Sequence, residues 1–229
     1  IGALFIEQGM ADVVICGAVD FPLVESILGG FFTMNGAYRP KEGHTEEPPE
    51  KASRPFSINR RGFVVSEGAG CIIMASKDFA KNHGLAPKIE MAGWSMTSDA
   101  HHFVAPNLGT VRGCIAESIG HSRLQAGDID AVNAHGTSTK IGDKIEADAL
   151  KEIFGSDIPP VSANKSQTGH AMGASSAIEI VFAMEGMLRD TVLPTINYTP
   201  DPEIAIDCVH EGARRIVQEH VLKNSFGFG

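Results

Sequence analysis

Two polar segments bring histidines to the ends of predicted buried strands. His135 follows the apolar run 130–133 and precedes three hydroxyl side chains at positions 137–139. His170 ends the polar run 164–169, which itself follows the apolar run 160–163. Ligands of α/β sheets bind at the carboxyl ends of the strands. Two imidazoles that converge there have the chemistry to stabilise a developing oxyanion by donating hydrogen bonds.

The position of His170 also predicts its charge. A helix is predicted over 170–188, with small residues at 173–176 in its first turns. Near a helix N-terminus the positive end of the helix dipole disfavours imidazolium, so the ring stays a neutral donor. For His135 an alternative is open, because an isolated His-Gly-Thr segment is equally typical of a turn whose hydroxyls cap the next helix. The second histidine segment favours the chemical interpretation.

A lysine and a glutamate are candidates to act with the histidines. Glu146 lies one helical turn after Asp143, so both carboxylates share a face of the helix predicted over 142–154, whereas Asp148 points away. We predict that Glu146 is the partner of Lys165. The alternative is that Glu146 is a solvated charge on the helix surface.

The spacing of candidate ligands disfavours a metal centre. The histidines show no H-E-x-x-H pattern, the cysteines form no C-x-x-C pair, and no phosphate-binding glycine loop is present. The cysteines stand in apolar surroundings, which favours reduced, buried thiols in a cytoplasmic protein. They are Cys16, Cys71, Cys114 and Cys208.

Helices and strands alternate along the chain, which is typical of an α/β fold with buried strands. Between residues 29 and 55, glycines, prolines and charges instead predict a long surface excursion. Helices are predicted over 1–8, 110–122, 142–154 and 170–188. Strands are predicted over 13–16, 62–65, 71–75, 88–92, 130–133 and 160–163.

Composition narrows the class of protein. The 229 residues are 43% hydrophobic and 21% charged, as in an ordinary globular chain of one or two domains. The net charge of −9 disfavours a nucleic acid or an anionic membrane as partner. The sequence has no stretch of about 20 apolar residues that would predict a membrane span.

Taken together, the motifs resemble the β-ketoacyl-acyl-carrier-protein synthases, the condensing enzymes of the thiolase superfamily. The likeness covers nearly the whole chain, and the motifs match in order and spacing. They lie at 54–56, 61–64, 67–70, 98–100, 133–139, 142–146, 165–173 and 224–229.

The resemblance implies an α/β, thiolase-like layered fold (αβαβα), incomplete at both ends of this chain. Residues 1–87 would be the remainder of the first thiolase-like half, and residues 88–229 the second half with both histidine motifs. The implied reaction is a decarboxylative Claisen condensation in fatty acid or polyketide synthesis. A cysteine takes an acyl group from acyl carrier protein, and malonyl-acyl carrier protein then loses CO2 and attacks that thioester.

The resemblance also assigns roles to individual residues. His135 and His170 would stabilise the oxyanions, organised by Lys165 that Glu146 holds. Thr137 and Thr139 would hydrogen-bond the pantetheine, and Phe226 would also line the substrate site. Phe228 would gate the site, with its backbone N–H in the oxyanion hole. In some relatives a structural cation lies at the positions of Asn133 and Glu146; no cofactor is implied beyond the carrier's phosphopantetheine. A cytoplasmic homodimer is expected.

The nucleophilic cysteine of the family is expected about ten residues or fewer before Ile1, and both ends suggest a piece of a longer protein. None of the four cysteines present is expected to replace it. Two alternatives therefore stay open. One is a non-elongating homologue, either a chain-length partner subunit or a malonyl decarboxylase-like variant. The other is a thiolase-like enzyme that uses coenzyme A, which the run at 162–170 disfavours.

Overall fold

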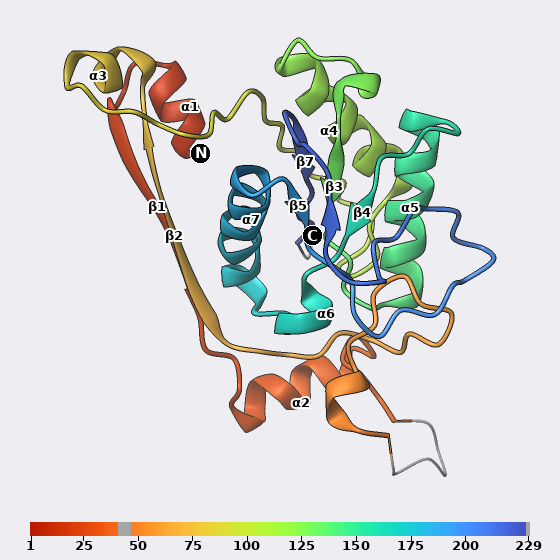
Figure 1. Cartoon of the computed structure of the whole chain (residues 1–229). Coiled ribbons are helices and arrows are strands. Elements are labelled where there is room, and N and C mark those ends of the chain that lie inside the picture. Colours follow the sequence, from red (N-terminus) through yellow and green to blue (C-terminus); the bar gives the residue numbers. More distant parts are fainter. Residues whose placement is uncertain (41–46, 228–229) are drawn as a thin grey trace.

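The computed structural model describes residues 1–40 and 47–227 of the chain. In this part, helices alternate with short strands from the middle of the chain onward, as the sequence predicts (Figure 1). The helices are α1 (Gly2–Glu7), α2 (Glu25–Thr33), α3 (Lys77–Asn82), α4 (Leu108–His121), α5 (Lys140–Phe154), α6 (Lys165–Thr168) and α7 (Met172–Leu188), with 3-10 turns η1 (Pro49–Lys51) and η2 (Ala126–Asp128). The strands are β1 (Val13–Asp20), β2 (Gly68–Ala75), β3 (Ala131–Asn133), β4 (Val161–Ser162), β5 (Thr191–Val192), β6 (Arg214–Arg215) and β7 (Val221–Lys223).

A parallel sheet of three strands, in the order β4-β3-β7, forms the centre of the structure. Val132 of β3 is in register with Val161 of β4 on one side and with Leu222 of β7 on the other. Every residue of β3 is buried, as expected for a parallel strand covered on both faces. Helices α4 and α5 cover one face and α7 the other (Figure 1). The carboxyl end of this sheet is where both histidine segments begin.

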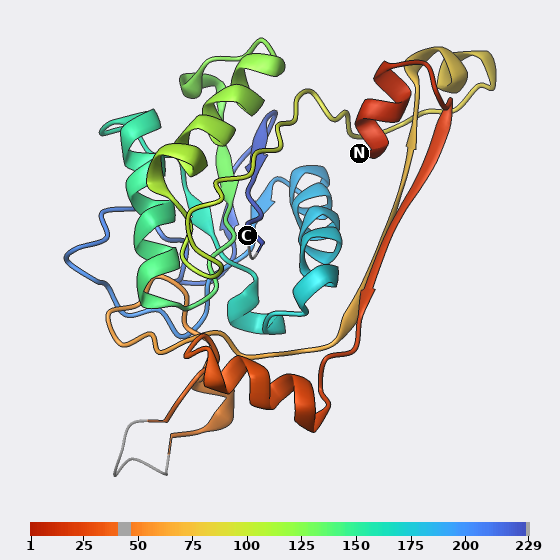
Figure 2. The same ribbon diagram turned by 180° about the vertical axis from the view of Figure 1, so that it is seen from behind.

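Strands β1 and β2 lie far apart in the sequence but pair along their whole length as an antiparallel two-stranded ladder, called the β1–β2 hairpin below. This hairpin packs against α7 on one face (Figure 2). Burial alternates along both strands, so every second side chain points away from α7. Ile15, Val19 and Ile73 are among the large apolar side chains on that outer face, 61–71% exposed. Cys71 is exposed on it too, Cys16 and Cys114 are partly exposed, and the prediction that all four thiols are buried is confirmed only for Cys208.

The predicted elements agree with the structure where the apolar pattern is long. All four predicted helices are present with shifted ends, and the strands at 13–16, 71–75, 130–133 and 160–163 are confirmed; the first runs on to Asp20. The predictions at 62–65 and 88–92 are wrong. Phe63 and Val65 make only isolated bridges, and 88–92 has no ladder partner among the described residues.

The excursion predicted between residues 29 and 55 is only partly at the surface. Its first residues belong to α2, and Ala52, Ser53 and Arg54 near its end are buried. Residues 41–46 lie outside the described part of the chain. Within the described residues, no helix has both the length and the apolar character needed to cross a membrane.

Candidate active site

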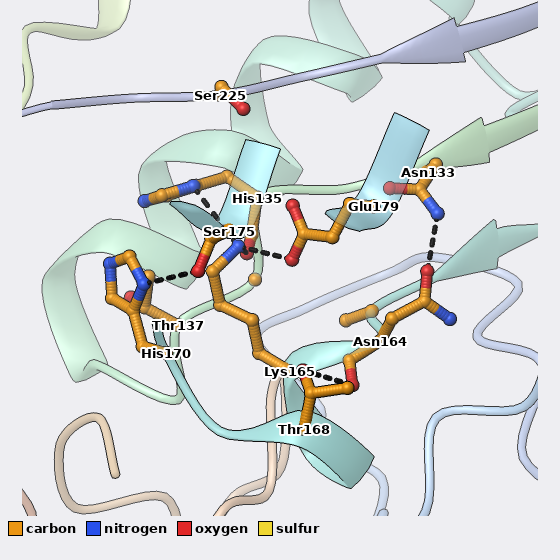
Figure 3. Close-up of polar contacts among 12 residues, drawn as sticks. Asn133, His135, Thr137, Asn164, Lys165, Thr168, His170, Ser175, Glu179 and Ser225 are labelled. Carbon is orange, nitrogen blue, oxygen red and sulfur yellow. Dashed lines mark hydrogen bonds and ion pairs between the residues drawn. The ribbon is translucent and has the colours of Figure 1, made fainter. Parts of the chain in front are cut away.

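The structure brings His135 and His170 together from two separate segments (Figure 3). His135 lies two residues beyond β3, and His170 lies two residues before α7. The backbone of His170 is fixed by its N–H, which donates to Val64 O at 2.7 Å, and by its carbonyl, which accepts from Ser66 N at 3.0 Å. The two ring centroids are 5.5 Å apart, with the ring planes at 85°. Two imidazoles therefore face one small region at the carboxyl end of the sheet.

Neighbouring side chains fix the orientation of both rings. Phe63 packs edge-on against His170 with centroids 5.6 Å apart, and Phe226 lies 5.1 Å from His135. His170 Nδ1 is 2.9 Å from Ser175 Oγ, and His135 Nδ1 is 3.4 Å from Lys165 Nζ. An ammonium only donates, so His135 Nδ1 accepts and the proton of the neutral ring resides on Nε2. The free edge of His135 is therefore a hydrogen-bond donor.

Both imidazoles are held in the neutral form. Burial, reinforced by the positive charge of Lys165, lowers the pKa of His135 well below its ordinary value. The same two causes lower the pKa of His170 to about 3. The ring of His135 keeps partial exposure, yet protein atoms surround it on most sides. The helix dipole was predicted to keep His170 neutral, whereas desolvation and the charge of Lys165 are the causes in the structure.

The partner of Lys165 is Glu179, so the predicted pairing with Glu146 is wrong. Lys165 Nζ donates to Glu179 Oε1 at 2.6 Å and to His135 O at 2.7 Å, and both charged side chains are 1% exposed (Figure 3). Burial lowers the pKa of Lys165 to about 8, against the opposing effect of Glu179. Glu179 lies one turn after Ser175 on α7, so one face of this helix holds both Lys165 and His170.

Glu146 instead shapes the turn that carries His135. Its Oε1 accepts from the N–H of His135 at 2.8 Å and from Asn224 Nδ2 at 3.0 Å, and its Oε2 accepts from the N–H of Gly136 at 2.8 Å. The alternative of a solvated surface charge is also wrong, since Glu146 is 1% exposed. The carboxylate satisfies backbone donors that would otherwise be buried without a partner.

Asp143, on the same face of α5, does the same for the next residues. It accepts from the N–H of Phe56 at 2.7 Å, of Thr137 at 3.0 Å and of Thr139 at 3.3 Å. Burial raises the pKa of Asp143 to about 7 despite these donors. The shared face of the two carboxylates was predicted correctly, but both serve the loop rather than a lysine.

The remaining predicted site residues lie around the two rings. The hydroxyls of Thr137 and Thr139 are 3.0 Å apart, so one donates to the other. Phe226 contacts His135 as described, and Phe228 lies outside the described residues. Asn133 donates from Nδ2 to Asn164 Oδ1 at 2.6 Å, while its own Oδ1 is buried without a hydrogen-bond partner. Across residues 1–40 and 47–227, no three His, Cys, Asp or Glu side chains cluster as a metal site would require.

Sequence reasoning missed Glu179, Ser175 and Lys223. Lys223, the last residue of β7, places Nζ 2.8 Å from Glu179 Oε2. A signal for Glu179 was present, because it is the only charged residue in the otherwise small and apolar run 171–184. An isolated charge on a buried helix needs a buried partner.

Fold and site together define an α/β protein whose sheet carries an imidazole pair and a buried lysine at its carboxyl end. The chain belongs to the β-ketoacyl synthase family. Residues 2–80 match the beta-ketoacyl synthase N-terminal domain, and residues 89–199 match the beta-ketoacyl synthase C-terminal domain.

Individual relatives agree with this assignment. The chain is 36% identical over 232 residues to 3-oxoacyl-[acyl-carrier-protein] synthase 2 of Coxiella burnetii, covering 99% of this chain and 55% of that protein. It is 35% identical over 229 residues to the synthase of the same name from Staphylococcus aureus, covering 98% of this chain and 54% of that protein. The chain thus spans about half the length of the curated relatives it matches.

Solved structures confirm the predicted thiolase-like fold. A beta-ketoacyl synthase from Burkholderia phymatum superposes with a TM-score of 0.90 at 32% identity, over 100% of this chain and 55% of that one. A type II PKS acyl-carrier protein in complex with its ketosynthase bound to the hexaketide gives a TM-score of 0.93 at 31% identity, over 99% and 56% of the two chains. The division of this chain at residue 87 stays a prediction.

Proposed function

We propose that the protein containing this chain is a β-ketoacyl synthase that condenses an acyl thioester with malonyl-acyl carrier protein by decarboxylative Claisen chemistry. The observation that carries the proposal is the pair of neutral imidazoles, His135 and His170, with centroids 5.5 Å apart. Relatives that bear the name 3-oxoacyl-[acyl-carrier-protein] synthase 2 support it.

The proposed reaction needs donors for negative oxygen rather than a strong acid or base. When the malonyl thioester loses CO2, the electron pair of the broken C–C bond moves onto the thioester oxygen as an enolate. The enolate carbon then attacks the acyl thioester carbonyl, forms the new C–C bond and passes negative charge to a second oxygen, until the thiolate leaves. Neutral N–H donors already in place stabilise both oxyanions without reorganisation.

Lys165 contributes by fixing the donor edge of His135. Its ammonium lies on the Nδ1 side of the ring, so the N–H at Nε2 faces outward. Glu179 holds that ammonium within the buried site. Glu146 acts one step further back, because it holds the backbone of His135 and Gly136. Lys165, Glu179 and Glu146 are thus positioning residues for the imidazoles.

The proposal extends to the substrates and partners of the protein. Phosphopantetheine on acyl carrier protein would carry both thioesters, with Thr137 and Thr139 as hydrogen-bonding partners and Phe226 and Phe228 lining and gating the site. The complex of a related ketosynthase with its acyl-carrier protein supports this partner. We also propose a homodimer, and the cytoplasm as its location, in keeping with four unpaired cysteines.

None of the four cysteines in this chain has the surroundings of a catalytic nucleophile. Burial raises the pKa of Cys208 to about 12, which makes it a poor nucleophile, and Cys16 Sγ packs at 3.8 Å against Met74 Sδ. Cys71 lies on the outer face of the hairpin and Cys114 on α4. A malonyl decarboxylase-like homologue needs the imidazoles but no nucleophile, so the same site would serve it.

The test is malonyl-thioester decarboxylation by the protein that contains these residues, with His135→Ala, His170→Ala and the exposed control His83→Ala. Each site variant is expected to lose at least about a hundredfold in rate, the usual loss for one oxyanion donor, while the control keeps the normal rate. Unchanged decarboxylation in both site variants would refute the proposed roles. Condensation product beside CO2 identifies the synthase rather than the decarboxylase, and faster turnover of carrier-protein than coenzyme A thioesters separates it from a thiolase-like enzyme.

A further inference from the structure

The buried carboxylate of Glu179 lies between two ammonium groups. Lys165 Nζ is 2.6 Å from Oε1, and Lys223 Nζ is 2.8 Å from Oε2. Both glutamate and Lys165 are 1% exposed, and the side chain of Lys223 is 13% exposed. Lys223 reaches the site from β7, where it is paired with Asn133 of β3. Its ammonium also donates to Asn224 O and, at 3.0 Å, to Ser225 Oγ.

One ammonium would neutralise this carboxylate, so Lys223 brings a second positive charge to a site in which Glu146 is the other buried carboxylate. Burying an extra charge is unfavourable unless partners compensate for the lost water. Here Glu179 Oε2 and two oxygens of the next residues supply that compensation. The charge of Lys223 also adds to the causes that keep both imidazoles neutral.

The cation implied at Asn133 and Glu146 does not fit the residues present. Both oxygens of Glu146 already accept hydrogen bonds from N–H donors. Both oxygens of Glu179 face lysine ammonium groups. Asn133 Oδ1 and Glu179 Oε2 are both buried without a hydrogen-bond partner, but the ammonium of Lys223 lies 2.8 Å from Glu179 Oε2 as an ion pair. That leaves one amide oxygen, which does not make a cation site. A metal ion there would also be repelled by two ammonium groups.

We propose that Lys223 is a positioning residue of the site, whose ammonium is the built-in cation that orients the Glu179 carboxylate toward Lys165. The chain of contacts runs from Lys223 to Glu179, from Glu179 to Lys165, and from Lys165 Nζ to the carbonyl and Nδ1 of His135. Without Lys223, Glu179 Oε2 would need another cation or donor. The structural part of this inference stands by itself, and its catalytic part rests on the proposed function.

The experiment compares three substitutions at this position. Lys223→Ala removes the ammonium and leaves space, Lys223→Met removes it and fills the space, and Lys223→Arg keeps a cation. Melting temperatures are measured first in a buffer whose only cation is too large to enter the space left by the ammonium of Lys223. They are then measured again with methylammonium or K⁺ added. Lys144→Ala is the control, since Lys144 forms a half-exposed pair with Asp148.

We expect Lys223→Ala and Lys223→Met to melt about 5 °C lower, as when a buried acceptor loses its partner. Methylammonium or K⁺ should restore the alanine variant but not the methionine variant, and should leave the wild type and Lys144→Ala unchanged. Lys223→Arg should keep most of the melting temperature. The proposal is overturned if Lys223→Ala melts like the wild type, or if no added cation restores it.

The rate of decarboxylation, measured on the same variants, separates the pairing of Lys223 with Glu179 from its role in catalysis. We expect Lys223→Ala to lower kcat more than it raises KM, and methylammonium to restore kcat together with the melting temperature. A restored melting temperature in a protein that decarboxylates no malonyl thioester would refute the proposed function but not the pairing. An unchanged kcat in a destabilised variant would refute the positioning role.

Discussion

Replacing Glu146 tests whether this carboxylate holds the loop of the first imidazole. Its two oxygens accept three hydrogen bonds, from the N–H of His135, the N–H of Gly136 and Asn224 Nδ2, in a site 1% exposed. Each buried donor left without a partner costs about 1–3 kcal/mol. Glu146→Ala should therefore lower the free energy of unfolding by about 4 kcal/mol. Glu146→Gln, which keeps one acceptor oxygen but turns an NH2 toward a donor, should lower it by about 2 kcal/mol.

Urea denaturation of the protein that contains this chain measures the effect, with Glu152→Gln as control. Glu152 is on the same helix and forms an exposed pair with Arg112 at 3.0 Å, so its loss should change the free energy by less than about 0.5 kcal/mol. A displaced His135 should also slow decarboxylation by about a hundredfold in Glu146→Gln. If Glu146→Gln unfolds within about 0.5 kcal/mol of the wild type, the three hydrogen bonds do not have the role assigned to them.

Two further predictions concern pH and packing. The pKa of His170 is lowered to about 3 in the folded chain, so between about pH 6.5 and 3 the unfolded chain binds a proton on this ring and the folded chain does not. The free energy of unfolding should therefore be unaffected by His170 above about pH 6.5 and should fall by about 1.4 kcal/mol for each pH unit below it. Asp143, with its pKa raised to about 7, has the opposite slope, so urea titrations from pH 4 to 7 should compare the wild type with His170→Gln, and identical slopes would contradict this. Gly70→Ala should lower stability by about 1–3 kcal/mol, because a Cβ there would lie 2.8 Å from the backbone of α7 at Ala177, whereas Gly17→Ala on the partner strand meets nothing closer than 3.9 Å. Equal melting temperatures for those two glycine variants would show that the hairpin does not pack on α7 as described.

The parts of the fold that sequence could predict are those with a long periodic pattern. Helices α4 and α5 each carry an apolar face that belongs to the same buried cluster as the sheet, and their existence follows from that spacing alone. The same holds for the two polar segments after β3 and β4. Their chemistry is visible in sequence because a strand followed by polar residues places those residues at the sheet edge where ligands bind.

The short apolar runs failed for a physical reason. The runs at 62–65 and 88–92 have the composition of strands, but a strand exists only where a partner backbone lies alongside. Phe63 and Val65 instead bridge singly to Ala37 and His170, and so connect the loop to the site. The hairpin shows the opposite error, since the prediction ended β1 at Cys16 although Gly17 to Asp20 continue its pairing with β2. The residues of a short apolar run do not show which distant segment, if any, its backbone pairs with.

The partner of Lys165, predicted as Glu146 but found to be Glu179, could not be identified from the sequence. Both glutamates are on helices near the lysine segment, and helical spacing places either on an inward face. What separates them is where each helix lies: Glu146 of α5 is within hydrogen-bond distance of the N–H groups of the turn after β3, whereas α7 brings Glu179 to the lysine. A buried carboxylate binds whichever donors surround it, N–H groups in one case and ammonium groups in the other. One glutamate therefore fixes the backbone of the first imidazole, and the other fixes the ammonium beside it.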